Sequence, residues 1–206
     1  MNKPLPAGAA AAVPSSSTEL WCWRHPRAEG AAGRCIGRTN LAVDPRRAKR
    51  LAHRIRGVAR RHGLPHEAWV SPLRRCCDVG RWLRRWGWRV HVDQRLRELD
   101  FGAWDGHPWT HIAWHEVEAW QADLLHHAPG GGETLAALAL RVQAFVTGAG
   151  PGPRLVVTHG GWINALRVVP AGGGSVNAAH WPAPPRCGAL WRQTVDLPLA
   201  SAGCRL

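Results

Sequence analysis

Two histidines, each at the end of a short apolar run, are the residues whose type and context best suit chemistry. Residues 20–25 read LWCWRH and end in the pair Arg24-His25, and residues 154–161 read RLVVTHGG and place His159 before two glycines. Apolar runs that end abruptly in polar and glycine residues are typical of buried parallel strands, and ligands bind at the carboxyl ends of such strands. The sequence therefore predicts that Arg24, His25 and His159 meet in one site.

These residue types suit phosphoryl transfer. A neutral imidazole is a competent nucleophile toward phosphorus, and a guanidinium beside it can hold phosphate oxygens. His159 could donate a hydrogen bond to the transferring phosphoryl group, and the glycines after it allow a close backbone approach. Taken alone, Arg24-His25 would be interpreted as a satisfied surface pair.

Two segments between these histidines carry further candidate residues. Residues 71–75 read SPLRR at an expected strand-to-helix turn, where a helix N-terminus and a nearby arginine favour an anion. Residues 96–106 read LRELDFGAWDG and hold Glu98, Asp100 and Asp105. A carboxylic acid here could protonate a leaving alkoxide if its pKa is raised, although acids in such a segment more often cap loops.

Alternating strands and helices must position these residues. Strands are expected at 20–23, 68–70, 89–92, 155–158 and 189–195. Helices are expected after Asp44-Pro45 and Ser71-Pro72, and at 109–125, 133–146 and 162–168. This alternation predicts an α/β fold, a three-layer αβα sandwich with a central, mostly parallel sheet.

Length and composition fit one domain. The chain has 206 residues with 45% hydrophobic content, and residues 1–18 are rich in Ala, Pro and Ser, so we expect a disordered tail before a domain at 19–206. The net charge of +13 favours anionic partners, but an arginine-rich coding bias accounts for it equally well. The six cysteines show no C-x-x-C spacing and no stretch reaches transmembrane length, which favours a reduced, cytoplasmic protein without a membrane partner.

Together these segments resemble the histidine phosphatase superfamily, also called the phosphoglycerate mutase-like or branch 1 family. Motifs in that family's order are RH at 24–25, SPLRR at 71–75, LRELDFG at 96–102 and THGG at 158–161. GRCIGRTNL at 33–41 and GGET at 131–134 are also similar to family segments. The resemblance covers residues 19–195, so it assigns the domain at 19–206 to a histidine phosphatase.

The resemblance implies a role for each candidate residue. His25 would be the nucleophile that forms a phosphohistidine, and Arg24 and Arg75 would hold the phosphate. His159 would bind and stabilise the transferring phosphoryl group, and Glu98 would act first as general acid and then as base for water. Phosphoryl transfer is mainly positioning and charge stabilisation, which fixed cations can supply. No metal or cofactor is then required.

Two departures from the family pattern surround the nucleophile. The usual glycine after it is Pro26, which lacks a backbone N–H and biases His25 toward an extended conformation. The lost amide could weaken phosphate binding. The usual asparagine six residues after the nucleophile is Ala31. Because the catalytic residues remain, we expect activity.

Within the family, the signature at 96–106 looks most like α-ribazole phosphatases of cobalamin biosynthesis. The expected substrate is therefore α-ribazole 5′-phosphate or the cobalamin 5′-phosphate. Trp109, Trp114 and Trp120 could stack on its nucleobase-like ring, although tryptophans at such spacings more often pack a helix onto the core. The alternative is a phosphatase or mutase for another small phosphomonoester, such as a sugar phosphate or phosphoglycerate.

Two other interpretations compete with a phosphatase. A basic helix could bind nucleic acid through Arg46, Arg47, Lys49, Arg50, Arg54, Arg56, Arg60 and Arg61. A solvated face in an arginine-rich chain is the simpler interpretation, so no nucleic-acid partner is expected. His107, His111 and His115 have helical spacing that suggests a metal site, but we favour surface or lid residues. The sequence leaves the oligomeric state open.

Overall fold

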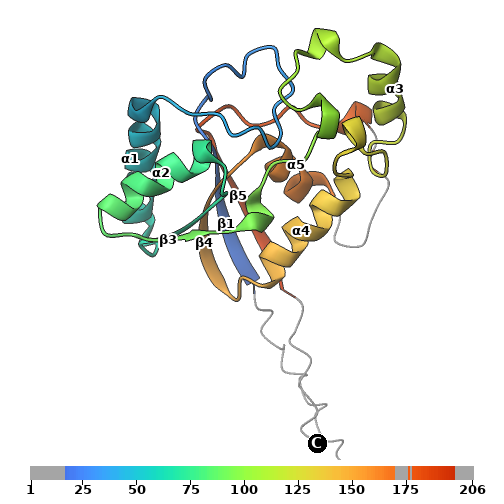
Figure 1. Cartoon of the computed structure of the whole chain (residues 1–206). Coiled ribbons are helices and arrows are strands. Elements are labelled where there is room, and N and C mark those ends of the chain that lie inside the picture. Colours follow the sequence, from blue (N-terminus) through green and yellow to red (C-terminus); the bar gives the residue numbers. More distant parts are fainter. Residues whose placement is uncertain (1–16, 170–175, 177, 198–206) are drawn as a thin grey trace, which may run out of the picture.

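A five-stranded sheet in the order β3-β2-β4-β1-β5 forms the centre of the molecule (Figure 1). The computed structural model describes residues 17–169, 176 and 178–197. The strands are β1 (Ser17–Arg24), β2 (Glu67–Val70), β3 (Arg89–Val92), β4 (Gly152–Thr158) and β5 (Leu190–Asp196). All neighbouring strands pair in parallel except β5, which runs antiparallel to β1. The predicted, mostly parallel sheet is confirmed.

Helices cover both faces of this sheet. They are α1 (Pro45–His62), α2 (Arg74–Arg85), α3 (Trp114–Ala122), α4 (Leu135–Thr147) and α5 (Gly160–Val168). Trp21 and Trp23 of β1 are buried against α1 and α2, whereas Leu20 and Cys22 are buried against α4 and α5. This alternation follows from the two-residue period of a strand and makes a three-layer αβα sandwich, as the sequence predicts.

Short helical turns lie in the connections between these elements. They are the 3-10 segments Gln94–Leu96, Gly102–Trp104, Trp109–His111, Pro129–Gly131 and Ala178–His180. The loops that follow β1, β2 and β4 lie at one edge of the sheet, with α3 beyond them (Figure 1). No helix among the described residues is long and apolar enough to cross a membrane.

Several predicted boundaries differ from the structure, and three of the differences change how an element is understood. β1 begins at Ser17, inside the tail predicted at 1–18, because Thr18 is buried and its hydroxyl donates to the Gly152 carbonyl at 3.0 Å. The rest of that tail, residues 1–16, lies outside the described residues. The helix predicted at 109–125 divides into a 3-10 turn and α3, because the backbone is extended at Ile112 and Ala113.

The third correction concerns α4, which begins at Leu135 and not at Glu133. Thr134 is the N-cap, and its side chain accepts a hydrogen bond from the Ala137 amide. Glu133 precedes this cap, where its amide donates to the Asp100 carbonyl at 2.8 Å and its carboxylate pairs with Arg141. The prediction placed the start too early, because an acid that precedes the N-cap cannot be distinguished in sequence from an acid in the first turn.

Candidate active site

The parallel pairing of β1 with β4 brings the two histidines together. Arg24 and Thr158 are register partners, so the next residues, His25 and His159, leave the sheet side by side. The His25 amide donates to the Thr158 carbonyl at 2.9 Å, and the two imidazole centroids lie 5.0 Å apart. Both side chains are buried.

His25 is held as a neutral imidazole with a free Nε2 lone pair. Its Nδ1 atom lies 2.6 Å from the Pro26 carbonyl oxygen, which can only accept, so Nδ1 carries the proton. Burial, the Arg75 charge and the Arg24 charge lower the pKa of His25 to about 3. The side chain is therefore an uncharged imidazole at neutral pH.

Arg75 lies in the first turn of α2, where it contacts the loop that follows β1 and the histidine that follows β4. Its guanidinium donates to the carbonyls of Gly37 at 2.6 Å and Thr39 at 2.8 Å, and its Nε donates to His159 Nδ1 at 3.2 Å. Arg75 is buried, whereas its neighbour Arg74 is exposed and pairs with an aspartate on its own helix. The structure thus places Arg75, and not Arg74, in the site.

Arg24 uses only part of its guanidinium group for hydrogen bonds within the described part of the chain. One terminal nitrogen donates to the Pro185 carbonyl at 2.7 Å, but the buried Nε has no hydrogen-bond partner in the described part of the chain. A buried donor without a partner is rare and calls for an acceptor, such as a bound anion. Gly160 packs closely against this group and Pro184, because a Cβ there would lie 2.8 Å from Pro184 Cβ and 3.3 Å from the Arg24 Cζ and Nε atoms.

His159 contacts Arg75 and Ser71. Because Arg75 Nε can only donate, His159 Nδ1 accepts and Nε2 carries the proton, 2.7 Å from the Ser71 hydroxyl. Burial, followed by the positive charge of Arg75, lowers the pKa of His159 well below its usual range. Donation from Nδ1 to a phosphoryl group would require His159 to gain a proton and leave Arg75, so that role stays a prediction. Sequence reasoning gave Ser71 no role of its own.

Glu98 is held at the start of α5 by backbone amides. Its carboxylate accepts from the amides of Gly161 at 3.1 Å, Trp162 at 3.2 Å and Leu99 at 3.1 Å. A Cβ at Gly161 would lie 2.5 Å from Glu98 Oε1, so the carboxylate can sit there only because that residue is glycine. The second glycine of the His-Gly-Gly motif therefore positions an acid from a distant loop.

The other two acids of the same segment have structural partners. Asp100 pairs with Arg38 at 2.9 Å, and Asp105 accepts from the backbone amides of Gly37 and Thr39, each at 2.9 Å. Neither of them lines the cavity that contains His25. Of the three candidates from the sequence, Glu98 is the acid that the structure brings to the nucleophile.

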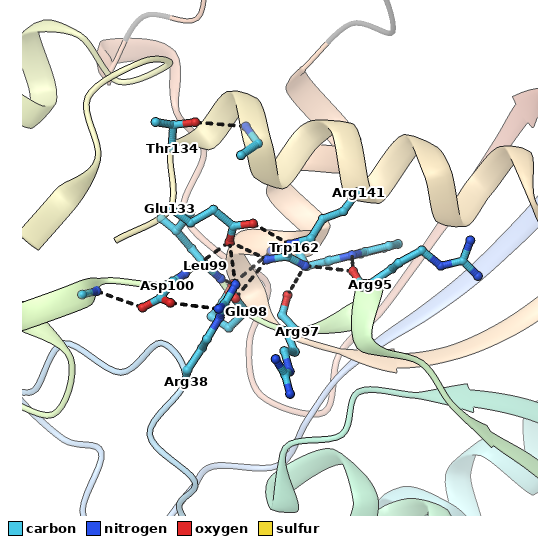
Figure 2. Close-up of polar contacts among 12 residues, drawn as sticks. Arg38, Arg95, Arg97, Glu98, Leu99, Asp100, Glu133, Thr134, Arg141 and Trp162 are labelled. Carbon is cyan, nitrogen blue, oxygen red and sulfur yellow. Dashed lines mark hydrogen bonds and ion pairs between the residues drawn. The ribbon is translucent and has the colours of Figure 1, made fainter. Parts of the chain in front are cut away.

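Arg141 of α4 fixes the backbone on which Glu98 sits (Figure 2). Its guanidinium donates to the carbonyls of Arg95 at 2.9 Å, Arg97 at 2.7 Å and Glu98 at 3.0 Å. It also pairs with both carboxylate oxygens of Glu133, at 2.6 and 2.7 Å. Sequence reasoning missed Arg141. The available signal was the single charged residue within a mostly apolar helix, LAALALRVQAFVT.

A cavity of about 700 Å³ joins these residues to a partly aromatic wall. The polar end includes the proposed nucleophile, acid and phosphate-binding arginines. The apolar wall includes Phe101, Trp109, Trp120, Leu124 and Trp181. Trp114, the third tryptophan predicted to stack on a ring, is 66% exposed and lies outside this cavity. The volume suits a ligand larger than a bare phosphate.

The helical spacing of three histidines left a metal site as an alternative to surface or lid positions. Within residues 17–169, 176 and 178–197, no group of three or more His, Cys, Asp or Glu side chains is arranged to hold a metal ion. His107, His111 and His115 line a separate hollow beside α3.

Comparison with known proteins agrees with this geometry. The chain matches the histidine phosphatase superfamily (branch 1) over residues 20–182. It is 34% identical over 135 residues to a glucosyl-3-phosphoglycerate phosphatase of Mycobacterium tuberculosis (strain CDC 1551 / Oshkosh). That match covers 55% of this chain and 56% of the relative, so the chain spans about half the length of the curated relatives it matches.

Solved structures share the fold. Mycobacterial hydrolase 2 superposes with a TM-score of 0.72 at 24% identity, covering 90% of this chain and 85% of that one. The α-ribazole phosphatase of Shigella flexneri superposes with a TM-score of 0.66 at 21% identity, covering 88% and 91%. The family match extends over most of the chain and includes His25, Arg75, Glu98 and His159. The chain therefore belongs to the histidine phosphatase superfamily, branch 1.

Proposed function

We propose that this protein is a metal-independent phosphomonoesterase that works through a phosphohistidine at His25. One observation carries the proposal: the neutral His25, with its free Nε2 lone pair, lines the same cavity as Arg24, Arg75 and Glu98. A nucleophile, two fixed cations and one acid are the groups that phosphoryl transfer to an imidazole needs.

In the first half of the reaction, His25 Nε2 forms a bond to phosphorus while the bond from phosphorus to the ester oxygen breaks. Arg24 and Arg75 hold the equatorial oxygens and offset the charge that develops on them. Glu98 gives its proton to the leaving oxygen, so that an alcohol departs and not an alkoxide.

In the second half, the Glu98 carboxylate takes a proton from water as the water oxygen attacks phosphorus. The phosphorus–Nε2 bond breaks, its electron pair returns to His25, and inorganic phosphate leaves. The Pro26 carbonyl accepts from His25 Nδ1 throughout, which keeps the ring oriented and stabilises the positive charge that it carries as a phosphohistidine.

Hydrolysis in the presence of a chelator tests this proposal. The purified protein should release phosphate from p-nitrophenyl phosphate with EDTA in the assay. Complete loss of activity with EDTA, followed by recovery with a divalent cation, would reject the mechanism.

For the substrate, we propose first α-ribazole 5′-phosphate or the cobalamin 5′-phosphate. The signature at 96–106 favours it, and Trp109 and Trp120 in the cavity wall offer faces for a flat ring. Stacking on one such face contributes about 1–3 kcal/mol, by analogy with nucleobases. That stacking predicts a preference of roughly ten- to hundredfold in kcat/KM over 3-phosphoglycerate. A preference for the compact ester would reject the cobalamin assignment and leave the phosphatase intact.

The second candidate is another small phosphomonoester, such as a sugar phosphate or phosphoglycerate. The 34% sequence identity to a glucosyl-3-phosphoglycerate phosphatase favours it, because the name of that relative includes both a sugar and a phosphoglycerate group. For either candidate, we propose a small metabolite in the cytoplasm as the partner, and neither nucleic acid nor a membrane. The cysteines among the described residues are free thiols, which suits a reducing compartment.

A further inference from the structure

We propose that the substrate carries a second acidic group besides its phosphoester, and that Arg27 and Arg34 bind this group at the mouth of the cavity. This inference rests on the proposed phosphomonoesterase function and deepens it. It names a substrate class, an acid-bearing phosphomonoester, and the two residues that select it.

The charge of the cavity wall is the first observation. Four arginines line the cavity, namely Arg24, Arg27, Arg34 and Arg75, and the acidic residue among its lining side chains is Glu98. A phosphomonoester dianion is balanced by the two inner guanidinium groups of Arg24 and Arg75. The two outer guanidinium groups remain, and they favour a further negative charge on the ligand.

The second observation is that the outer arginines lack acidic partners. Arg34 donates to the Gly106 carbonyl at 3.2 Å, and Arg27 makes no hydrogen bond or ion pair within the part of the chain that the structure describes. Both side chains are exposed, so solvent and ligand reach them. Among the described contacts, Glu98 forms no ion pair with either arginine, and its carboxylate oxygens accept from backbone amides instead.

The loop that carries these arginines is anchored to the rest of the domain. The Glu29 amide donates to the Ala42 carbonyl at 2.9 Å, and the Cys35 amide donates to the His107 carbonyl at 2.9 Å. Cys35 is fully buried. The backbone that carries both arginines is therefore anchored, which removes the backbone contribution to the entropic cost of binding an anion.

Position separates these two arginines from the many others on the surface. The arginines of α1 face solvent on the outer layer of the sandwich, whereas Arg27 and Arg34 share a cavity wall with His25. Guanidinium groups bind carboxylate or phosphate oxygens in a bidentate manner, so either group could be the second anion. The aromatic wall formed by Phe101 and Trp109 accommodates the carbon skeleton between the two charges. This charge pattern favours the second candidate substrate, an acid-bearing ester, over the first, α-ribazole 5′-phosphate, which has one anionic group. The kcat/KM comparison of 3-phosphoglycerate with α-ribazole 5′-phosphate decides between them.

A matched pair of substrates tests the inference. 3-Phosphoglycerate and glycerol 3-phosphate differ by a carboxylate in place of a hydroxymethyl group. Fructose 1,6-bisphosphate and fructose 6-phosphate differ by a second phosphate. The wild type should prefer the acid-bearing member of at least one pair by about tenfold in kcat/KM, and the responding pair identifies the second anion as carboxylate or phosphate.

Substitutions then assign the preference to residues. Arg27→Ala and Arg34→Ala should each lower the ratio of the two kcat/KM values by about fivefold, and the double variant should bring it near one. Arg61→Ala removes the same charge from α1, outside the cavity, and should keep the wild-type ratio. The preference should also shrink as salt is raised.

Failure of the inference and failure of the proposed function give different results. A wild-type enzyme that hydrolyses p-nitrophenyl phosphate but shows ratios near one for both pairs would overturn the inference alone. A preference that Arg27→Ala and Arg34→Ala leave unchanged would overturn the assignment to these residues. No hydrolysis of any ester would overturn the proposed function itself.

Discussion

The proposed role of Glu98 as general acid can be distinguished by experiment from a purely structural role. A general acid contributes about 10²–10⁴-fold, and it contributes most when the leaving group is a poor one. Glu98→Gln should therefore lose far more rate on an alkyl phosphate than on p-nitrophenyl phosphate, whose leaving group needs little protonation. Steady-state rates on both substrates measure the difference.

Asp100→Asn supplies the control, because Asp100 pairs with Arg38 outside the cavity. Its losses should be small and similar for both leaving groups. Equal losses on both substrates in Glu98→Gln would show that Glu98 acts structurally and that another group is the acid.

His25 should carry the phosphoryl group covalently. His25→Ala should abolish turnover, because His159, the other imidazole at the site, is held by contacts with Arg75 and Ser71. Rapid quenching of the wild type with labelled substrate should trap a phosphoprotein that is stable in alkali and labile in acid. His159→Ala should slow turnover severely but still allow the adduct to form. Near-normal turnover in His25→Ala would contradict the nucleophile assignment.

At the scale of elements, the start of α5 limits where Glu98 can lie. Gly161→Ala places a Cβ 2.5 Å from Glu98 Oε1, so the carboxylate must move. Misplacing a catalytic group by about 1 Å can cost 10²-fold in rate, and we expect kcat to fall by about that factor. Circular dichroism should show an unchanged fold, because alanine is a better helix former than glycine.

Gly57→Ala in α1 provides the matched control. The nearest atom to its added Cβ is Arg61 Nη1 at 3.7 Å, an ordinary contact. This variant should gain about 0.5–1 kcal/mol in the free energy of unfolding and keep full activity. Full activity in Gly161→Ala would show that the position of Glu98 does not limit the reaction.

The packing of α4 behind the Glu98 segment predicts a joint loss of stability and rate. Arg141→Gln breaks the pairs with Glu133 and the bonds to three carbonyls, leaving partly buried acceptors without a donor. The free energy of unfolding in urea should fall by about 2–4 kcal/mol. The surviving folded enzyme should show the leaving-group dependence of Glu98→Gln. Arg60→Gln on the exposed face of α1 should change neither property.

The elements could be predicted because their signals are local. The apolar runs that end at His25 and at His159 predicted β1 and β4, and Asp44 with Pro45 predicted the start of α1. The partners of Arg141 could not be predicted in this way. Its bonds to the segment before Glu98 depend on how α4 packs, which no periodicity of the helix itself encodes.

The site residues were likewise only partly predictable from the sequence. The ordered motifs, through the family resemblance, named His25, the two arginines and Glu98, whereas residue type alone left Glu98, Asp100 and Asp105 equivalent. Only the tertiary structure shows that Asp105 anchors a loop and that Glu98 reaches α5. The effect of Pro26 was also hidden, because its carbonyl contact with His25 depends on a side-chain rotamer.

At the scale of the whole molecule, the site draws on nearly every part of the sandwich. His25 follows β1, Arg75 begins α2, Glu98 follows β3 and His159 precedes α5. The site can therefore form only when all three layers have assembled. Burying two neutral histidines beside arginines costs free energy when the layers assemble. It also makes the stability of the fold depend on pH.

The sign of this linkage follows from the lowered pKa values of His25 and His159. The pKa of His25 is about 3 in the folded chain, and burial also holds the pKa of His159 well below its usual range. Both histidines bind protons near pH 6.5 once the chain unfolds. As the pH falls below 6.5 toward the folded pKa, the unfolded state binds more protons, so the fold loses stability.

Stability should therefore drop in mild acid, before most carboxylates titrate. Each histidine contributes up to about 1.4 kcal/mol per pH unit, so the free energy of unfolding should be about 2–3 kcal/mol lower at pH 5.5 than at pH 7.5. Urea unfolding at the two pH values measures it. His25→Gln removes one titrating group and should halve the difference, since His159 remains. Equal stability of the wild type at both pH values would mean that these imidazoles are protonated in the fold, and an imidazolium at His25 could not attack phosphorus.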